Sequence, residues 1–334
     1  MNPEQKHNDK VEPMTIESLD RLCLYPIQHP KLFKNYEDQL NRFWVYNEIN
    51  FATDYSDWLK MHPDEQYYIS KTLAFFANSD NAVMENIENR YKEIQWPEAR
   101  LALGMQSMME GIHVVSYNNM ISAVIKDPEE RQKLFHAVKY DPIIAKKIAW
   151  MQKWAADKKT PLHQCFVAQC FSEGIGFSPN FASILWLRKN NKCSGICFGN
   201  EKIIPDETLH VKLFALLASM CSFPIPVATC VEMCREIVEI ECEFVDDRLP
   251  YNLQGMNKQL MKQYVHSVAD NILGLLNIPP IYNVANPFDF MELAVNALTK
   301  DSFFEKSVSD YQKTMKEDFI KSKSFKNLGQ SIDF

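Results

Sequence analysis

Apolar residues recur at intervals of three and four positions from about Arg21 to Asn296. Side chains at this spacing share one face of an α-helix, so the pattern predicts a protein built mainly of amphipathic helices. The 334 residues include only 9 glycines, and no two alternating segments suggest a pair of strands. We therefore expect an all-α fold in one bundle domain. Prolines predict interruptions near Pro97, Asp127-Pro128, Asp141-Pro142, Pro224 to Pro226 and Pro279-Pro280.

The two ends of the chain depart from the helical pattern. Residues 1–20 are polar and charged with little periodicity, which is typical of a loose N-terminal arm. Residues 21–303 carry the predicted bundle. Residues 304–334 are rich in Lys and Ser and end in Ile332, Asp333 and Phe334. This composition fits a flexible tail whose apolar end binds a partner, and it fits a solvated end equally well.

Charge and cysteine content narrow the possible functions. The net charge of −7 argues against nucleic-acid binding as the main task, because that affinity depends on clustered basic residues. The 9 cysteines are an odd number and no apolar signal segment follows Met1, so we expect a cytoplasmic protein with reduced thiols. Cys193 with Cys197, or Cys230 with Cys234, could form half of a zinc site. Neither pair has a second pair at a matching distance, which favours ordinary buried thiols.

One stretch has the apolar character of a membrane span. From Leu213 to Val231 the sequence contains no charged residue. Pro224 and Pro226, together with nearby Ser and Thr, favour a core helix that ends in a turn. We therefore expect no association with a membrane.

Four predicted helices carry ionisable residues on faces that the periodicity assigns to the interior. A buried carboxylate without a partner is costly, so such a group becomes protonated, pairs with a cation or binds a metal. No Arg or Lys shares these four faces. A metal site is therefore a candidate explanation. The residues concerned are Asp80, Glu110, His113, Glu173, Glu207 and His210.

The sequence Glu-x-x-His occurs on two of these faces, as Glu110 with His113 and as Glu207 with His210. This spacing brings both side chains within reach of one ion. One such motif is weak evidence, since the same pair is common on solvated faces. Two motifs plus two further carboxylates match the ligand set of ferritin-like di-iron and di-manganese proteins. Four carboxylates and two imidazoles without a thiolate suit iron or manganese. We therefore predict a ferritin-like helical bundle with a carboxylate-bridged di-metal site.

At these residues the sequence closely resembles the small subunit of class I ribonucleotide reductases, and the likeness extends from about Tyr25 to Phe334. The resemblance implies that the six residues bind two iron ions, oxo-bridged when oxidised, with manganese as the alternative metal. It also implies a homodimer that works with a large catalytic subunit, where ribonucleotides become deoxyribonucleotides. Supporting stretches are Arg42-Phe43-Trp44, Leu73-Ala74-Phe75-Phe76, Phe181-Ala182-Ser183-Ile184, Gly255-Met256-Asn257, Met261-Lys262-Gln263-Tyr264 and Asn286-Pro287-Phe288-Asp289-Phe290-Met291.

A tyrosine stands beside the second ligand motif. Tyr117 follows His113 by four residues on the same helix face, which places its phenol next to the metals. The radical tyrosine of the resembled family occupies this position. Phe177, Phe181 and Ile203 match the apolar pocket that shields the radical in that family. Ordinary core packing would explain these three residues as well.

The resemblance also implies a route for the radical. Trp44, Asp206 and His113 would form a hydrogen-bonded chain from the metal toward the surface, with Asp206 orienting the imidazole. Asp206 could equally be an exposed carboxylate near a helix start. Tyr311 matches the tyrosine that relays the radical between subunits, and the end at 332–334 matches the peptide that docks on the large subunit. Two ferrous ions would reduce dioxygen, Tyr117 would be oxidised, and the radical would reach a cysteine of the large subunit.

Two prolines depart from what the resemblance leads us to expect. Pro205 precedes Asp206, where many members have Arg, and removes a helical hydrogen bond. Pro179, next to Asn180, predicts a distorted third ligand helix. Two other classes of protein stay open: a ferritin-like oxidase or iron-storage protein without a large subunit, and a non-catalytic scaffold whose carboxylates form a structural network.

Overall fold

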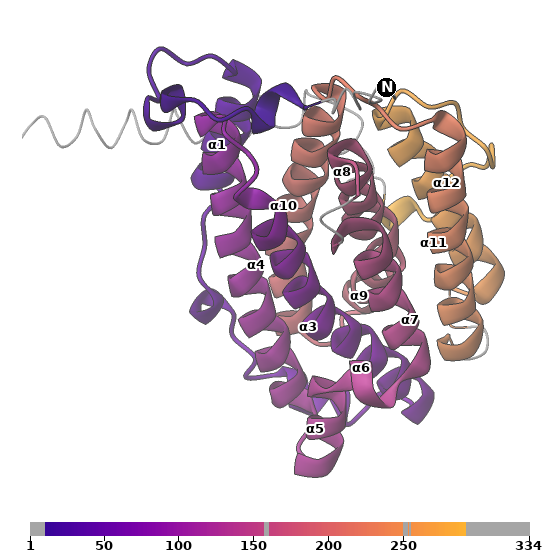
Figure 1. The fold of residues 1–334 in the computed structure, drawn as a ribbon. Helices are drawn as coiled ribbons and strands as arrows, with labels where there is room; N and C mark the ends of the chain where they lie inside the picture. The colour runs from indigo at the N-terminus through magenta and orange to yellow at the C-terminus, as the bar shows by residue number, and fades with distance from the viewer. Residues whose placement is uncertain (1–10, 157–159, 250–252, 254, 292–334) are drawn as a thin grey trace, which may run out of the picture.

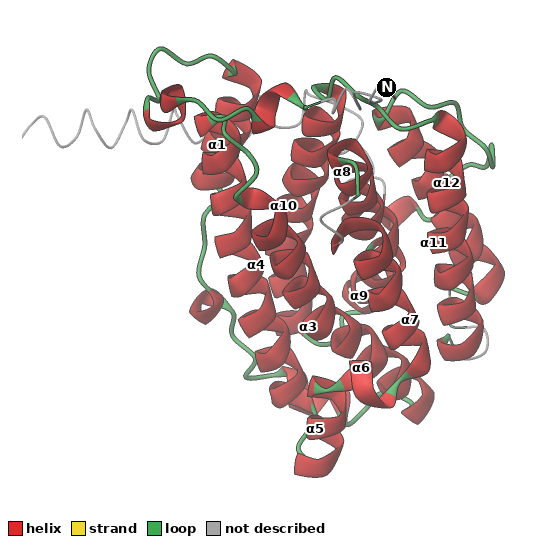
Figure 2. Cartoon of the chain, in the orientation of Figure 1, coloured by secondary structure: helices red, strands yellow, loops and turns green. Residues whose placement is uncertain are grey.

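The computed structural model describes residues 11–156, 160–249, 253 and 255–291, and within these ranges it contains helices and no strand (Figure 2). The long helices lie side by side in one bundle (Figure 1). The α-helices of the described ranges, short ones included, are α1 (Pro30–Asn41), α2 (Asp54–Trp58), α3 (Pro63–Tyr91), α4 (Pro97–Val124), α5 (Pro128–Phe135), α6 (Ala137–Tyr140), α7 (Pro142–Met151), α8 (Leu162–Phe171), α9 (Ser178–Lys189), α10 (Ser194–Ser219), α11 (Val227–Arg248) and α12 (Lys258–Leu275).

The prolines that the sequence marks as interruptions do separate helices. Pro97, Pro128 and Pro142 each stand at the first position of a helix. A backbone N–H there would have no hydrogen-bond partner within the helix, so its absence in proline costs little. The uncharged stretch 213–231 divides into the end of α10, a turn with Pro224 and Pro226, and the start of α11. The expectation of a core helix that ends in a turn is therefore confirmed. No helix in the described ranges is both long and apolar enough to cross a membrane.

The centre of the bundle is formed by α3, α4, α8 and α10. α3 packs along α4, and α10 packs against both α8 and α4. Large buried side chains such as Phe75, Phe76 and Phe171 fill the space between them. α11 and α12 cover one side of this centre, and α1 covers the other (Figure 1). The buried ionisable residues lie inside this core.

The start of α10 is fixed by a carboxylate from α2. Asp54 accepts hydrogen bonds from the N–H groups of Gly195 at 3.0 Å and Ile196 at 2.8 Å, which satisfies two of the free donors of the first turn. A Cβ on Gly195 would collide with the carbonyl oxygen of Asn50, so only glycine permits this contact. α10 then continues without interruption through Pro205.

Part of the predicted N-terminal arm contacts the bundle. Glu12 accepts hydrogen bonds from the backbone N–H groups of Ser222 and Phe223, each at 2.8 Å. Met14 is completely buried, and its carbonyl accepts from the N–H of Gln95 at 2.7 Å. The domain boundaries at residues 20 and 303 stay predictions, and the predicted tail 304–334 lies outside the described residues. All nine cysteines lie in the described ranges as free thiols.

Candidate metal centre

The six predicted ligands meet in the interior of the bundle. Asp80 comes from α3, Glu173 from a short π-helical segment η5 (Ser172–Gly176), and the two Glu-x-x-His motifs from α4 and α10. All six side chains are buried. They form two groups whose ligand atoms lie within 4.8 Å of one another, and Glu110 belongs to both groups. Glu110 would therefore be shared between the two groups if each held a metal ion. The groups are Asp80, Glu110 and His113, and Glu110, Glu173, Glu207 and His210.

The polar atoms of this cluster lie close together, yet several of them make no hydrogen bond. Nδ1 of His113 lies 2.9 Å from an oxygen of Glu207, and Nδ1 of His210 lies 2.9 Å from an oxygen of Glu110. Neither nitrogen makes a hydrogen bond of acceptable geometry. Buried polar atoms are rarely left without partners, so this convergence fits a site for cations. Further oxygens without a hydrogen-bond partner belong to Asp80, Glu110, Glu173 and Glu207.

The electrostatics of the cluster also call for positive charge. Burial raises the pKa of Asp80 well above its ordinary value, and the negative charge of Glu110 raises it further. The same two causes, in the same order, raise the pKa of Glu173. Carboxyl groups crowded in this way cannot all ionise unless cations compensate them. Divalent ions would supply that compensation.

Neighbouring polar side chains orient the carboxylates. Gln106 donates to Glu173 at 3.0 Å and lies 3.5 Å from Glu110. The Ser79 hydroxyl donates to Asp80 at 3.1 Å. Sequence reasoning assigned no role to either residue, although Gln106 precedes Glu110 by four positions on the same face. Such outer contacts hold metal ligands in position.

Asp206 joins the metal cluster to a tryptophan. Its Oδ2 accepts a hydrogen bond from Trp44 Nε1 at 2.7 Å and lies 3.2 Å from Nε2 of His113. Arg42 approaches the other oxygen at 3.8 Å. Asp206 is buried in the middle of α10, so the alternative of an exposed carboxylate near a helix start is wrong. These contacts join the three residues for which the resemblance implies a hydrogen-bonded chain, and the role of that chain stays a prediction.

Tyr117 is completely buried in an aromatic pocket. Its ring stacks on Phe76, with ring centres 4.5 Å apart and planes inclined by 8°. Phe76 in turn contacts Phe181 and Phe177, at centre distances of 4.7 and 5.5 Å. Ile203 is buried on α10. Burial raises the pKa of Tyr117 well above its ordinary value, and the charge of Asp80 adds to this, so the phenol is neutral. Sequence reasoning missed Phe76, which precedes Asp80 by four residues on the same face.

The helix that carries Glu173 is distorted, as Pro179 led us to predict. α8 ends at Phe171, the π-helical segment η5 follows, and α9 begins at Ser178 with Pro179 in its first turn. A π-helical turn widens the helix and is often found at functional sites. Here it directs Glu173 toward the cluster.

A buried lysine supports this segment. Nζ of Lys147, on α7, donates to the carbonyl oxygen of Gly176 at 3.2 Å and to Glu241 at 3.0 Å. It also lies 3.3 Å from the ring centre of Phe75. Burial lowers the pKa of Lys147, and it raises the pKa of Glu241 to about 7 despite the nearby ammonium group. The Lys147–Glu241 pair therefore holds the end of η5 in place through the hydrogen bond to the carbonyl oxygen of Gly176.

We expect Lys147→Met to lower the free energy of unfolding by about 3–5 kcal/mol, because Glu241 would remain buried without its cation. The pKa of Glu241 is higher in the folded protein than in the unfolded chain. The stability that this carboxyl group contributes is therefore lost as pH rises through about 7. The loss in the variant should consequently be larger at pH 8 than at pH 5.5. Urea denaturation at both pH values measures it.

The neighbouring lysine provides the control. Lys146 is half exposed and pairs with Glu243 at the surface, so Lys146→Met should change stability by less than about 1 kcal/mol at either pH. Equal losses in the two variants would contradict the anchoring role of Lys147.

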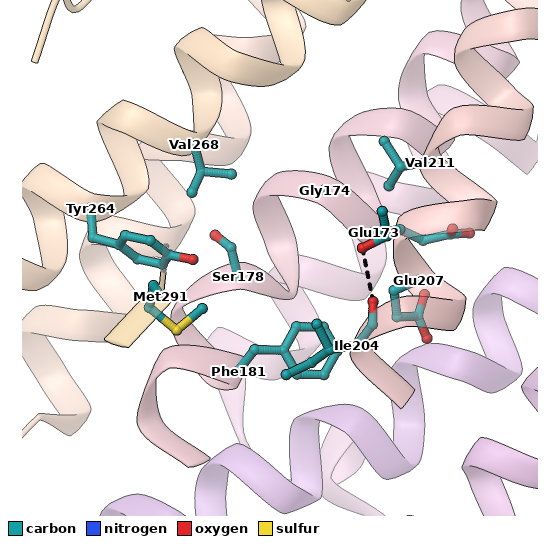
Figure 3. Close-up of a pocket in the computed structure, with 11 residues that line it drawn as sticks. Glu173, Gly174, Ser178, Phe181, Ile204, Glu207, Val211, Tyr264, Val268 and Met291 are labelled. Atoms are coloured by element: carbon teal, nitrogen blue, oxygen red, sulfur yellow. Dashed lines mark hydrogen bonds between the residues drawn. The ribbon is translucent and has the colours of Figure 1, made fainter. Parts of the chain in front are cut away.

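A small pocket leads to the cluster between η5, α10 and α12. Figure 3 shows Glu173 and Glu207 at one end of it and Tyr264 and Met291 at the other. Its walls are mainly apolar, and its cavity volume is about 40 Å³. A water molecule fits such a space, whereas a ribonucleotide does not.

The fold and the site together define a ferritin-like helical protein whose buried carboxylates and histidines can hold two metal ions. The family profile described as "Ribonucleotide reductase, small chain" matches residues 21–287. A ribonucleoside-diphosphate reductase small chain from Nicotiana tabacum is 40% identical over 303 residues, which covers 90% of this chain and 92% of that protein. The chain therefore belongs to the ribonucleotide reductase small-chain family and is the small subunit of an oxidoreductase.

Solved structures agree with this assignment. The Rnr4 homodimer of Saccharomyces cerevisiae ribonucleotide reductase superposes with a TM-score of 0.77 at 30% identity, covering 90% of this chain and 93% of that one. The dimanganese(II)-NrdF protein of Streptococcus sanguinis shares the fold, with a TM-score of 0.69 at 17% identity over 81% of this chain and 96% of that one. Family membership disfavours both the iron-storage and the scaffold alternatives.

Proposed function

We propose that this small subunit binds two iron ions, forms a tyrosyl radical at Tyr117 with dioxygen, and passes the radical to a large catalytic subunit. The observation that carries the proposal is the position of Tyr117, a buried neutral phenol on the same helix as Glu110 and His113. Iron would supply the chemistry with dioxygen that side chains lack. Manganese is the alternative metal, because the same ligands suit both ions.

The residues of the chain have separate tasks in this proposal. The six ligands hold the metal pair, and their unsatisfied atoms already point toward common centres. Phe76 stacks on the phenol, and Phe177 and Phe181 pack against Phe76; these three rings are proposed to exclude water, which would otherwise quench a radical. Ile203 is proposed to complete this pocket from α10.

The proposed exit for the radical begins at the hydrogen-bonded chain of His113, Asp206 and Trp44. Exposed aromatic residues stand close to Trp44 in the sequence. In space, the ammonium group of Lys202 lies over the rings of both Trp44 and Phe198. Phe43, Tyr46 and Phe198 are 46%, 45% and 44% exposed. Apolar surface of this kind favours contact with another protein.

The remaining proposed elements lie outside the described residues. Tyr311 is proposed to relay the radical between subunits, and Ile332, Asp333 and Phe334 to bind the large subunit. Both proposals rest on the sequence and on membership of the family. A cytoplasmic location also stays a prediction.

We expect Glu207→Ala to reduce the metal content to about one tightly bound ion per chain, because two cations would lose part of their compensating charge. Elemental analysis after loading with ferrous iron and removal of loosely bound metal measures this. Glu98→Ala is the matched control: Glu98 is buried but caps the N–H groups of Gln28 and His29 instead. Two retained equivalents in the Glu207 variant would contradict the ligand set.

We propose further that the protein forms a homodimer through the outer face of α4. From Leu101 to Val124 the ionisable residues Glu110 and His113 point into the core, so the outer face carries no charge. Met108 and Val115 are 48% and 37% exposed on this face, beside small residues that permit close packing. The similar yeast protein forms a homodimer, which supports dimerisation, while the choice of face rests on the exposed residues of α4.

Met108→Asp should convert the dimer to a monomer, because a carboxylate would have to be buried without a partner. Light scattering coupled to size-exclusion chromatography measures the mass. Val227→Asp, which adds the same charge at an exposed apolar position of α11, should leave the mass unchanged. An unchanged mass in both variants would place the interface elsewhere.

A further inference from the structure

A buried asparagine faces the phenol of Tyr117. The Tyr117 hydroxyl donates a hydrogen bond to Oδ1 of Asn200 at 3.1 Å, and both side chains are completely buried. Tyr117 belongs to α4 and Asn200 to α10, so the bond joins two helices that carry metal ligands. Asn200 precedes Ile203 by three residues and Glu207 by seven, which places the three on one helix face. Asn200 therefore lies in the wall of the site.

The surroundings of Asn200 set the orientation of its amide. Nδ2 donates to the carbonyl oxygen of Ile196 at 2.9 Å and lies 3.6 Å from the sulfur of Met120. An amide nitrogen is a donor only, so an amide held in this way turns its oxygen toward Tyr117. Gly199 makes room for this arrangement, because a Cβ there would collide with the end of the Met120 side chain. The orientation of the Asn200 oxygen toward Tyr117 is thus set by the contacts of Nδ2 with Ile196 and Met120.

We propose that Asn200 is a positioning residue for Tyr117, an inference that rests on the proposed function of that tyrosine. An amide oxygen accepts a hydrogen bond but is not basic at neutral pH, so Asn200 orients the hydroxyl without removing its proton. A phenol O–H prefers the plane of its ring, so the direction of the acceptor also restricts rotation of the ring. Phe76 stacks on one face of the Tyr117 ring and so also limits rotation of that ring. Together they hold one orientation of the phenol.

Oxidation of Tyr117 removes the hydroxyl proton, so Asn200 orients the reduced phenol before the radical forms. The stacked ring of Phe76 then keeps this orientation in the radical, where it can be measured. The coupling of the unpaired electron to the two Cβ protons depends on the angle between the Cβ–H bonds and the ring plane. A residue that merely stabilised the fold would not change this coupling. Electron paramagnetic resonance of the iron-loaded, oxygen-treated protein therefore reports on Asn200 directly.

The test compares Asn200→Leu with Asn200→Asp. Leucine fills a similar volume without an acceptor, so we expect altered Cβ-proton couplings and about tenfold slower formation of the radical, because the reduced phenol would lose one buried hydrogen bond. A protonated aspartic acid reproduces the amide, with its O–H toward Ile196 and its carbonyl toward Tyr117, and should restore the native spectrum. Asn86→Leu removes another buried amide, bonded to Gln169 on α8, and should leave the spectrum native.

A second measurement separates this inference from the proposed function. In metal-free protein labelled with ¹³C at tyrosine Cζ, the bonded Tyr117 hydroxyl should give a slowly exchanging proton resonance. Asn200→Leu should abolish this resonance, whereas Asn86→Leu should keep it. A native protein that formed no radical would contradict the proposed function, and the inference would then be judged on the hydroxyl resonance alone. A resonance that survives Asn200→Leu, or a native radical spectrum with a native rate of formation in that variant, would overturn the role of Asn200.

Discussion

Tyr117→Phe should abolish both the radical signal and reductase activity while two metal ions remain bound. Phenylalanine fills the same space against Phe76, so the aromatic pocket stays packed. It lacks the hydroxyl whose oxidation is proposed to yield the radical. The variant also leaves the oxygen of Asn200 buried without a donor, which costs about 1–3 kcal/mol of stability. Electron paramagnetic resonance, metal analysis and turnover with the large subunit measure the three properties.

A second buried tyrosine controls for the loss of a hydroxyl group. Tyr68 is buried and bonded to Ser183 at 2.6 Å, so Tyr68→Phe should lose a similar amount of stability. It should nevertheless keep the radical and the activity. A tyrosyl signal that persists in Tyr117→Phe would show that another tyrosine carries the radical.

Deletion of residues 327–334 should nearly eliminate turnover with the large subunit while radical formation at Tyr117 stays intact. The Lys-rich segment ends in two apolar residues, Ile332 and Phe334, and a few such anchors usually supply most of the affinity of a peptide. A free peptide of residues 327–334 should inhibit the intact enzyme. Activity assays over a range of large-subunit concentrations measure both effects.

The two proposed roles of the tail can be separated. A tail of the same composition in scrambled order should behave like the deletion. Tyr311→Phe should still bind the large subunit yet fail to support turnover, because the radical could not cross. Normal turnover by the truncated chain at low partner concentration would refute the docking role. Full activity of the Tyr311 variant would refute the relay.

The candidate metal ligands could be predicted from the sequence because they are exceptions to the rule that the apolar face of a helix carries no charged residue. Carboxylates on apolar helix faces are costly, and two Glu-x-x-His motifs supply the imidazoles that a metal needs. The structure brings all six together. The buried pair of Lys147 and Glu241 was not accessible, because Lys146 and Lys147 are adjacent and only the packing of α7 on α11 selects which one is buried.

Asn200 and Asp206 illustrate a different limit. A buried amide is common and cheap once it is hydrogen-bonded, so Asn200 does not stand out in a helical pattern. Asp206 is adjacent to Glu207, and consecutive residues of a helix point in directions about 100° apart. The resemblance named Asp206 as a partner of Trp44, but only the contact of Asp206 with Trp44 inside the bundle shows that this carboxylate is buried and not exposed. Tertiary contacts, and not local spacing, decide both cases.

Formation of a tyrosyl radical at a di-metal site is tested most directly by adding ferrous iron and then oxygen to the metal-free native protein and recording optical and electron paramagnetic resonance spectra. We predict about two bound iron ions per chain, the absorption of an oxidised iron pair and a tyrosyl radical signal that persists. A protein that binds the iron and reacts with oxygen but shows no tyrosyl signal, or that binds no iron at all, would contradict the account.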